Sequence, residues 1–155
     1  IENATLEPWG VKVKSKLDTG ALTSSLHARN IERFEKDGEE WVRFEVNVED
    51  QDEDEKVSRK FERPLYRDVI IRGAGGEERR PVVLMEICFG DTVHEEQFSL
   101  ENRSDMIYPV LIGRRTIQHL GVVDVTNTFM HEPQCDEDSP VEKFDKDNTD
   151  EDVGV

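Results

Sequence analysis

Hydrophobic and polar residues alternate along several short stretches of this chain. Between Val11 and Leu17 the odd positions hold apolar or small residues and the even positions hold lysines, and residues 42–48 repeat the pattern with valine and phenylalanine. A period of two places successive side chains on opposite faces of a strand, one of which faces a core. Further strands are predicted at residues 69–72, 80–89, 92–100, 108–112 and 122–126.

Turn signals separate the predicted strands. Gly73-Ala74-Gly75-Gly76 joins two of them as a flexible hairpin turn, and Gly90-Asp91 provides the next turn. A short helix is predicted at residues 114–120, ending at Gly121. Many short strands with little helix predict an all-β fold, either a barrel or a sandwich.

The composition places part of the chain outside the core. Of 155 residues 35% are hydrophobic, and 36 acidic residues against 20 basic ones give a formal net charge of −16. Residues 132–155 contain ten of the acids, two lysines and two prolines, which predicts a disordered acidic tail after a single domain at 1–131. The six acids between Glu49 and Glu55 predict a solvated loop.

Charge and hydrophobicity also exclude classes of partner. A charge of −16 repels a phosphate backbone, so we expect no nucleic-acid partner. No apolar run approaches the ~18 residues of a membrane helix, so we expect no membrane span. Because the sequence begins with Ile1, we expect a trimmed N-terminus and a periplasmic or cell-envelope location, with the cytoplasm as the alternative.

The two cysteines allow at most one internal disulfide. Cys88 lies in an apolar predicted strand and Cys135 in the acidic segment, so we expect them to remain unpaired. The four histidines are scattered, and the sequence lacks the two histidines four residues apart of a helical zinc protease site. We therefore expect no metal site and no cofactor.

The segment Asp18-Thr19-Gly20-Ala21 is the strongest candidate for chemistry. It follows the predicted strand at 11–17, and Gly20 allows a tight turn that surrounds the Asp18 carboxylate with backbone N–H groups. An ordinary Asx turn would explain the same residues. A second segment, Val110-Leu111-Ile112-Gly113-Arg114-Arg115, follows about ninety residues later and supports the functional interpretation.

Together the two segments resemble the pattern of retropepsin-like aspartic proteases. In that family the acid motif and an apolar strand ending in glycine cross beneath the active site, and residues 68–76 look like the glycine-rich hairpin flap between them. The resemblance implies a closed barrel with a flap and one short helix. Residues 16–28, 41–44, 102–106 and 108–115 are similar to a bacterial family often labelled ATP-dependent zinc proteases, some members of which are encoded beside ATP-grasp peptide ligases.

The resemblance implies an aspartic endopeptidase. The chain has one Asp-Thr-Gly segment, whereas the chemistry needs two carboxylates that share a proton around one water molecule, so we expect a homodimer. By this resemblance Asp18, Thr19 and Gly20 are catalytic, Ala21, Gly73, Ala74, Gly75, Ile112 and Gly113 bind substrate, and His27 and Arg114 lie beside the site.

Two other functions remain open from the sequence. The same fold can serve as a peptide-binding or regulatory module without turnover, and the family label allows a zinc-dependent hydrolase. The expected partners are a peptide or protein substrate, a second copy of the chain and an ATP-grasp peptide ligase. The sequence predicts no ATP-binding site, because the glycine-rich turn continues into Glu77 and Glu78, which would repel a phosphate.

Overall fold

The computed structural model describes residues 2–102, 108–120 and 133–144. The described elements are, in chain order, β1 (Glu2–Glu7), β2 (Val11–Leu17), β3 (Ser24–His27), β4 (Arg29–Lys36), β5 (Glu39–Asp50), β6 (Glu55–Pro64), β7 (Arg67–Gly73), β8 (Gly76–Phe89), β9 (Thr92–Glu101), β10 (Val110–Ile112), α1 (Arg114–Ile117) and β11 (Val141–Glu142). Among these residues no helix is long and apolar enough to cross a membrane.

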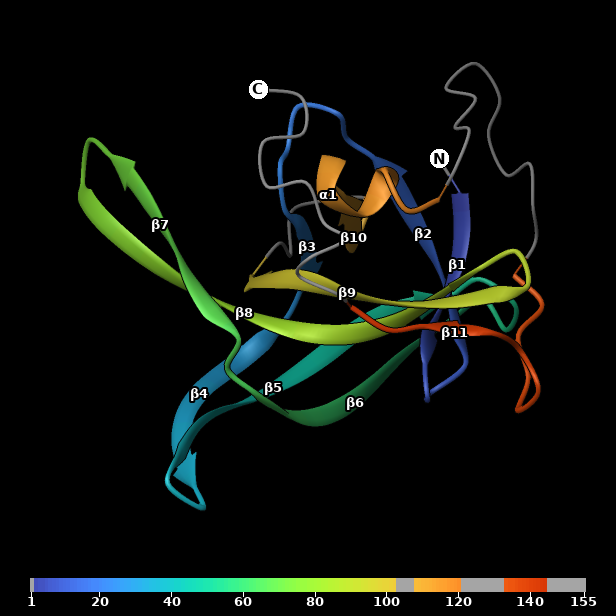
Figure 1. Ribbon diagram of the computed structural model, residues 1–155, viewed down its shortest axis with the longest axis horizontal. Coiled ribbons are helices and arrows are strands. Elements are labelled where there is room, and N and C mark those ends of the chain that lie inside the picture. Colours follow the sequence, from blue (N-terminus) through green and yellow to red (C-terminus); the bar gives the residue numbers. More distant parts are fainter. Residues whose placement is uncertain (1, 103–107, 121–132, 145–155) are drawn as a thin grey trace.

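Six of the strands close into a barrel (Figure 1). Their order is β9-β3-β10-β2-β1-β8, and the pairing of β8 with β9 completes the ring. The short strand β10 runs parallel to β2 and antiparallel to β3, so it lies between the two strands that flank residues 18–23. The prediction of an all-β barrel with one short helix is confirmed.

Residues 29–64 form a second sheet, in the order β4-β5-β6, whose apolar face belongs to the same core as the barrel. The even-numbered residues of β5 from 42 to 48 are buried, as their alternation predicted. Phe44 stacks on Phe61 with ring centroids 5.7 Å apart, and the Trp9 ring meets Phe61 edge-on. The loop predicted at residues 49–55 is shorter in the structure: the turn covers residues 51–54, because Glu49 and Asp50 end β5 and Glu55 begins β6.

Two predicted boundaries near the end of the barrel differ from the structure. The helix ends at Ile117, and the next residues form a tighter turn in which His119 donates to the Thr116 carbonyl at 2.9 Å. The strand predicted from residue 108 begins at Val110 because Pro109 has no N–H to contribute to a ladder. The predicted strand at 122–126 lies outside the described residues.

Residues 133–144, here called the C-terminal arm, are more ordered than their acidic composition predicted. Cys135 forms a disulfide with Cys88 at the end of β8, so the expectation of unpaired cysteines is wrong. Strand β11 extends the outer edge of β9, and the Phe144 ring packs edge-on against Tyr66 at 5.3 Å. This disulfide and these contacts offset the entropy of ordering the arm. Residues 145–155 of the predicted tail lie outside the described residues.

Candidate active site

Asp18 lies directly after β2, at the start of an exposed turn. Its Oδ1 accepts a hydrogen bond from the Gly20 N–H at 2.9 Å, and its own N–H donates to the Ile112 carbonyl at 2.8 Å. The Ala21 N–H donates to the Asp18 carbonyl at 3.2 Å. A Cβ at residue 20 would lie only 3.1 Å from Oδ1, so glycine suits this close approach. The turn therefore holds the carboxylate in one orientation.

Residues at the start of α1 hold this turn from the other side. The Arg114 N–H donates to the Ala21 carbonyl at 2.8 Å, and its Nη1 donates to the Thr19 carbonyl at 2.7 Å. The Arg115 N–H donates to the Leu22 carbonyl at 3.0 Å. These bonds satisfy backbone carbonyls of the turn and fix its position relative to β10.

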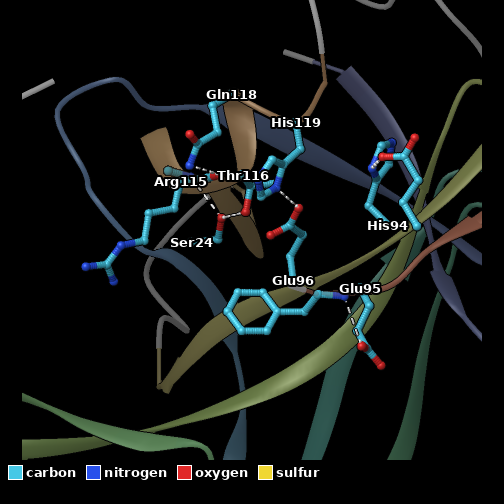
Figure 2. Close-up of polar contacts among 11 residues, drawn as sticks. Ser24, His94, Glu95, Glu96, Arg115, Thr116, Gln118 and His119 are labelled. Carbon is cyan, nitrogen blue, oxygen red and sulfur yellow. Dashed lines mark hydrogen bonds and ion pairs between the residues drawn. The ribbon is translucent and has the colours of Figure 1, made fainter. Parts of the chain in front are cut away.

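A buried pair of hydroxyl groups joins α1 to β3 (Figure 2). The Ser24 Oγ accepts the Gly113 N–H at 2.9 Å and donates to the Thr116 Oγ1, also at 2.9 Å. Both side chains are 1% exposed. Because water cannot replace these bonds in the closed interior, they determine how α1 is seated on the barrel.

The structure brings most of the predicted site residues together. Asp18, Thr19, Gly20, Ala21, Ile112, Gly113 and Arg114 form one contiguous cluster at the crossing of the two segments. The predicted flap is the β7–β8 hairpin, with Gly73 opposite Gly76 and with Ala74 and Gly75 between them at the tip. Figure 1 shows this tip well away from the end of β2. His27 is buried at the end of β3, where its N–H donates to the Pro109 carbonyl at 2.8 Å.

Residues 1–134 match the family described as RimB-like, the retropepsin-like aspartic endopeptidase RimB. The chain belongs to the RimB-like family. The match covers the Asp18 turn and the crossing segment that follows β10, and it agrees with the resemblance drawn from the sequence motifs. The zinc protease label is not confirmed by this match.

Curated relatives place the same region inside longer proteins. The chain is 34% identical over 118 residues to a protein from Shewanella pealeana named probable alpha-L-glutamate ligase, and 35% identical over 113 residues to a protein of the same name from Desulfotalea psychrophila. These alignments cover 76% and 72% of this chain but 25% and 24% of the relatives. The chain thus spans about a quarter of the length of the curated relatives it matches.

A solved structure has the same fold. The protein Lpg0085 of unknown function from Legionella pneumophila is 36% identical and superposes with a TM-score of 0.70. The similarity covers 84% of this chain and 94% of the Legionella chain. The barrel of this RimB-like chain is therefore shared with a protein of nearly the same extent.

A buried carboxylate and a histidine lie beneath the helix of this RimB-like barrel. Glu96 on β9 is 3% exposed, and its Oε1 lies 2.5 Å from the His119 Nδ1 (Figure 2). Burial raises the pKa of Glu96, and the contact with His119 partly opposes this shift. Neither residue was predicted from the sequence as part of a site. Glu96 lies two residues before the buried Phe98 in β9, and residues two apart in a strand share a face. This spacing could have placed the Glu96 side chain on the inner face.

His94 occupies the next inward position toward the start of β9. Its Nδ1 lies 3.3 Å from the Glu142 Oε2 of the C-terminal arm. Burial lowers the pKa of His94, although the nearby Glu142 carboxylate acts in the opposite direction. The barrel strand β9 therefore brings two ionisable side chains, His94 and Glu96, into contact with partners outside that strand, Glu142 and His119.

These side chains do not assemble a metal site. Within residues 2–102, 108–120 and 133–144, no group of three or more His, Cys, Asp and Glu side chains is placed to hold a metal ion. The Cys135 sulfur is bonded to Cys88, so it is not free to act as a thiolate ligand.

Proposed function

We propose that this chain is an aspartic endopeptidase in which Asp18 from two copies forms the catalytic dyad. The observation that carries this proposal is the Asp18 turn, whose carboxylate is held by the Gly20 N–H and whose backbone is tied to Ile112. Membership of the RimB-like family supports the same chemistry. Thr19 and Gly20 are exposed, so a second turn can approach them across a two-fold axis.

The proposed reaction needs both carboxylates. Two carboxyl groups about 3 Å apart cannot both ionise, so they share one proton. The ionised Asp18 accepts a proton from a water molecule while the water oxygen attacks the peptide carbonyl carbon. The protonated Asp18 of the other copy donates its proton to the carbonyl oxygen, which gives a tetrahedral diol intermediate. The tetrahedral intermediate then breaks its C–N bond, and the amine leaves with a proton from the dyad. As the product carboxylic acid forms, a hydroxyl group of the diol intermediate gives its proton to the dyad, which returns to its singly protonated state.

The β7–β8 hairpin is the proposed cover for a bound peptide. Its strands pair from Arg67 opposite Val82 to Gly73 opposite Gly76, and Ile70 and Ile71 expose apolar surface. In this proposal the tip residues Gly73, Ala74 and Gly75 close over the peptide and exclude water. In this proposal Ala21 contacts the peptide backbone near Asp18, whereas the predicted substrate-binding residues Ile112 and Gly113 are buried and support the site from beneath, together with His27 and Arg114.

The names of the curated relatives favour a link between this domain and a glutamate ligase. We therefore choose a glutamate-containing peptide as the first substrate to test. The same relatives also favour a second function, in which the domain binds a peptide for a ligase without cleaving it. An intact Asp-Thr-Gly turn supports the endopeptidase, because a binding groove has no need for two carboxylates that share a proton.

The test compares cleavage by the natural chain and by Asp18→Asn, which keeps the shape of the side chain but removes the base. Glutamate-containing peptides are incubated with each protein, and new termini are detected by mass spectrometry. We expect cleavage by the natural chain only, unaffected by a metal chelator and inhibited by a statine-containing peptide. Binding of the peptides by both proteins without cleavage would support the binding module instead. Loss of activity with a chelator and its recovery with zinc would support the metal-dependent hydrolase.

A further inference from the structure

The Thr23 hydroxyl oxygen accepts hydrogen bonds from two arginine side chains, which come from different elements. Arg67 Nη2 donates to the Thr23 Oγ1 at 3.0 Å, and Arg115 Nη1 donates to the same oxygen at 3.1 Å. A hydroxyl oxygen has two lone pairs, so it can accept both bonds at once. Thr23 lies five residues after Asp18 and immediately before β3. One hydroxyl group therefore joins the Asp18 segment to α1 and to the start of β7.

Arg67 is held rigidly at the base of the β7–β8 hairpin. Its Nε donates to the Gln97 Oε1 on β9 at 2.7 Å, and Gln97 is only 3% exposed. The guanidinium group is planar, so fixing Nε at Gln97 and Nη2 at Thr23 sets the orientation of the whole group. Arg67 also forms the first pair of the β7–β8 ladder, opposite Val82, so the ladder begins at this anchored residue.

The hairpin has a second anchor on its other side, where Arg33 of β4 pairs with Asp68 at 2.5 Å. That pair is solvent-exposed, with 38% of the Arg33 side chain accessible, so water and salt weaken it. It also connects the hairpin to the second sheet and not to the Asp18 segment. The Thr23 contact joins the hairpin to the segment that carries the proposed catalytic residue.

We propose that Thr23 is a positioning residue that fixes the direction of the β7–β8 hairpin relative to Asp18; this role in catalysis rests on the proposed function. The strands of the hairpin extend away from the barrel (Figure 1). The orientation of the hairpin over a bound peptide is therefore set by the contacts at its base. Loss of the Thr23 hydroxyl would leave two guanidinium groups facing a methyl group. The hairpin would then sample more orientations, and part of the peptide-binding free energy would be used to order it.

The test compares Thr23→Val, which keeps the side-chain shape but removes the acceptor, with Thr23→Ser, which retains the hydroxyl. Hydrogen exchange is measured by mass spectrometry on peptides covering residues 66–73. We expect Thr23→Val to speed exchange by about tenfold and Thr23→Ser by less than about threefold, because bonds to charged donors are among the stronger ones. Arg67→Met, which also loses the bond to Gln97, should speed exchange at least as much as Thr23→Val, and adding Thr23→Val to Arg67→Met should change exchange little.

Kinetics on a peptide that the natural chain cleaves provide the second measurement. Thr23→Val should raise KM several-fold with kcat within about twofold, and Thr23→Ser should restore KM. Unchanged exchange at residues 66–73 in a folded Thr23→Val, or in Arg67→Met if Thr23→Val does not fold, would overturn the proposal. If the natural chain cleaves no peptide, the proposed function fails, whereas the exchange result still decides whether Thr23 positions the hairpin.

Discussion

Gly113 lies directly against the backbone of Thr23. A Cβ at residue 113 would be 2.7 Å from the Thr23 carbonyl carbon and 2.9 Å from both the Leu22 carbonyl oxygen and the Ser24 nitrogen. Real side chains do not approach backbone atoms so closely, and backbone atoms cannot rotate away. The crossing of the Asp18 segment with the β10–α1 segment therefore depends on glycine at this position.

Gly113→Ala should destabilise the protein, because one of the two crossing segments must shift. Overpacking of this kind costs about 1–3 kcal/mol. The matched control is Gly75→Ala at the hairpin tip, where a new Cβ would meet no atom within 4 Å. Urea denaturation should show the loss for Gly113→Ala and a change below about 0.5 kcal/mol for the control. Equal stability of the two variants would contradict the close crossing.

The Glu96–His119 pair predicts a difference between two substitutions of Glu96. Glu96→Leu removes the partner of the partly buried His119 Nδ1 and should cost about 1–3 kcal/mol in the free energy of unfolding. Glu96→Gln keeps an oxygen acceptor and removes a charge whose burial is unfavourable, so it should remain within about 1 kcal/mol of the natural chain. Denaturation at neutral pH measures both. A Glu96→Leu variant as stable as Glu96→Gln would show that the pair contributes nothing.

The lowered pKa of His94 predicts a loss of stability in acid. In the range between its folded pKa and the ordinary value of 6.5, the unfolded chain binds more protons at this group, so stability falls as the pH falls through that range. His94→Gln removes the titration. Its free energy of unfolding should therefore decrease less than that of the natural chain between about pH 7.5 and pH 5.5. Parallel pH profiles for the two proteins would contradict the buried environment of His94.

The Cys88–Cys135 disulfide joins residues 47 positions apart. In the chain-entropy model, closing a loop of this length stabilises the folded state by about 4 kcal/mol, and measured stabilisations are usually at or below that value. Cys135→Ser should lower the free energy of unfolding by about 2–4 kcal/mol. It should also speed exchange at the Val93 N–H, which donates to the Pro140 carbonyl of the C-terminal arm. A reducing agent should weaken the natural chain and leave Cys135→Ser unchanged; an equal effect on both would rule out the disulfide as the cause.

Local patterns predicted the elements whose burial follows a simple period. β2 lies at the predicted residues because its apolar and polar side chains alternate, as they do in a barrel strand with one face toward the core. β3 was missed because all four of its residues are buried, so it has no alternation to detect. β6 was missed because it carries mostly exposed charges and is a strand through its pairing with β5. Strand pairing is a property of the folded chain, and propensity alone does not contain it.

The same limit applies to the candidate site. The Asp18 turn and Gly113 carry motifs that a single sequence displays. The Thr23–Arg67 contact joins residues 44 positions apart, and the Cys88–Cys135 bond joins an apolar strand to an acidic segment. Both contacts join segments that only the tertiary fold brings together, so neither composition nor spacing predicted them.

Mixing the natural chain with Asp18→Asn tests the shared dyad most directly. In a dimer with one carboxylate from each copy, a mixed pair has one Asp18 and no functional dyad. A tenfold excess of the variant, equilibrated with the natural chain at saturating peptide, should therefore reduce cleavage to roughly a tenth, since few natural chains still meet each other. Cleavage that stays at the level of the natural chain alone, after exchange of copies has been verified by native mass spectrometry, would contradict a dyad built from two Asp18 residues.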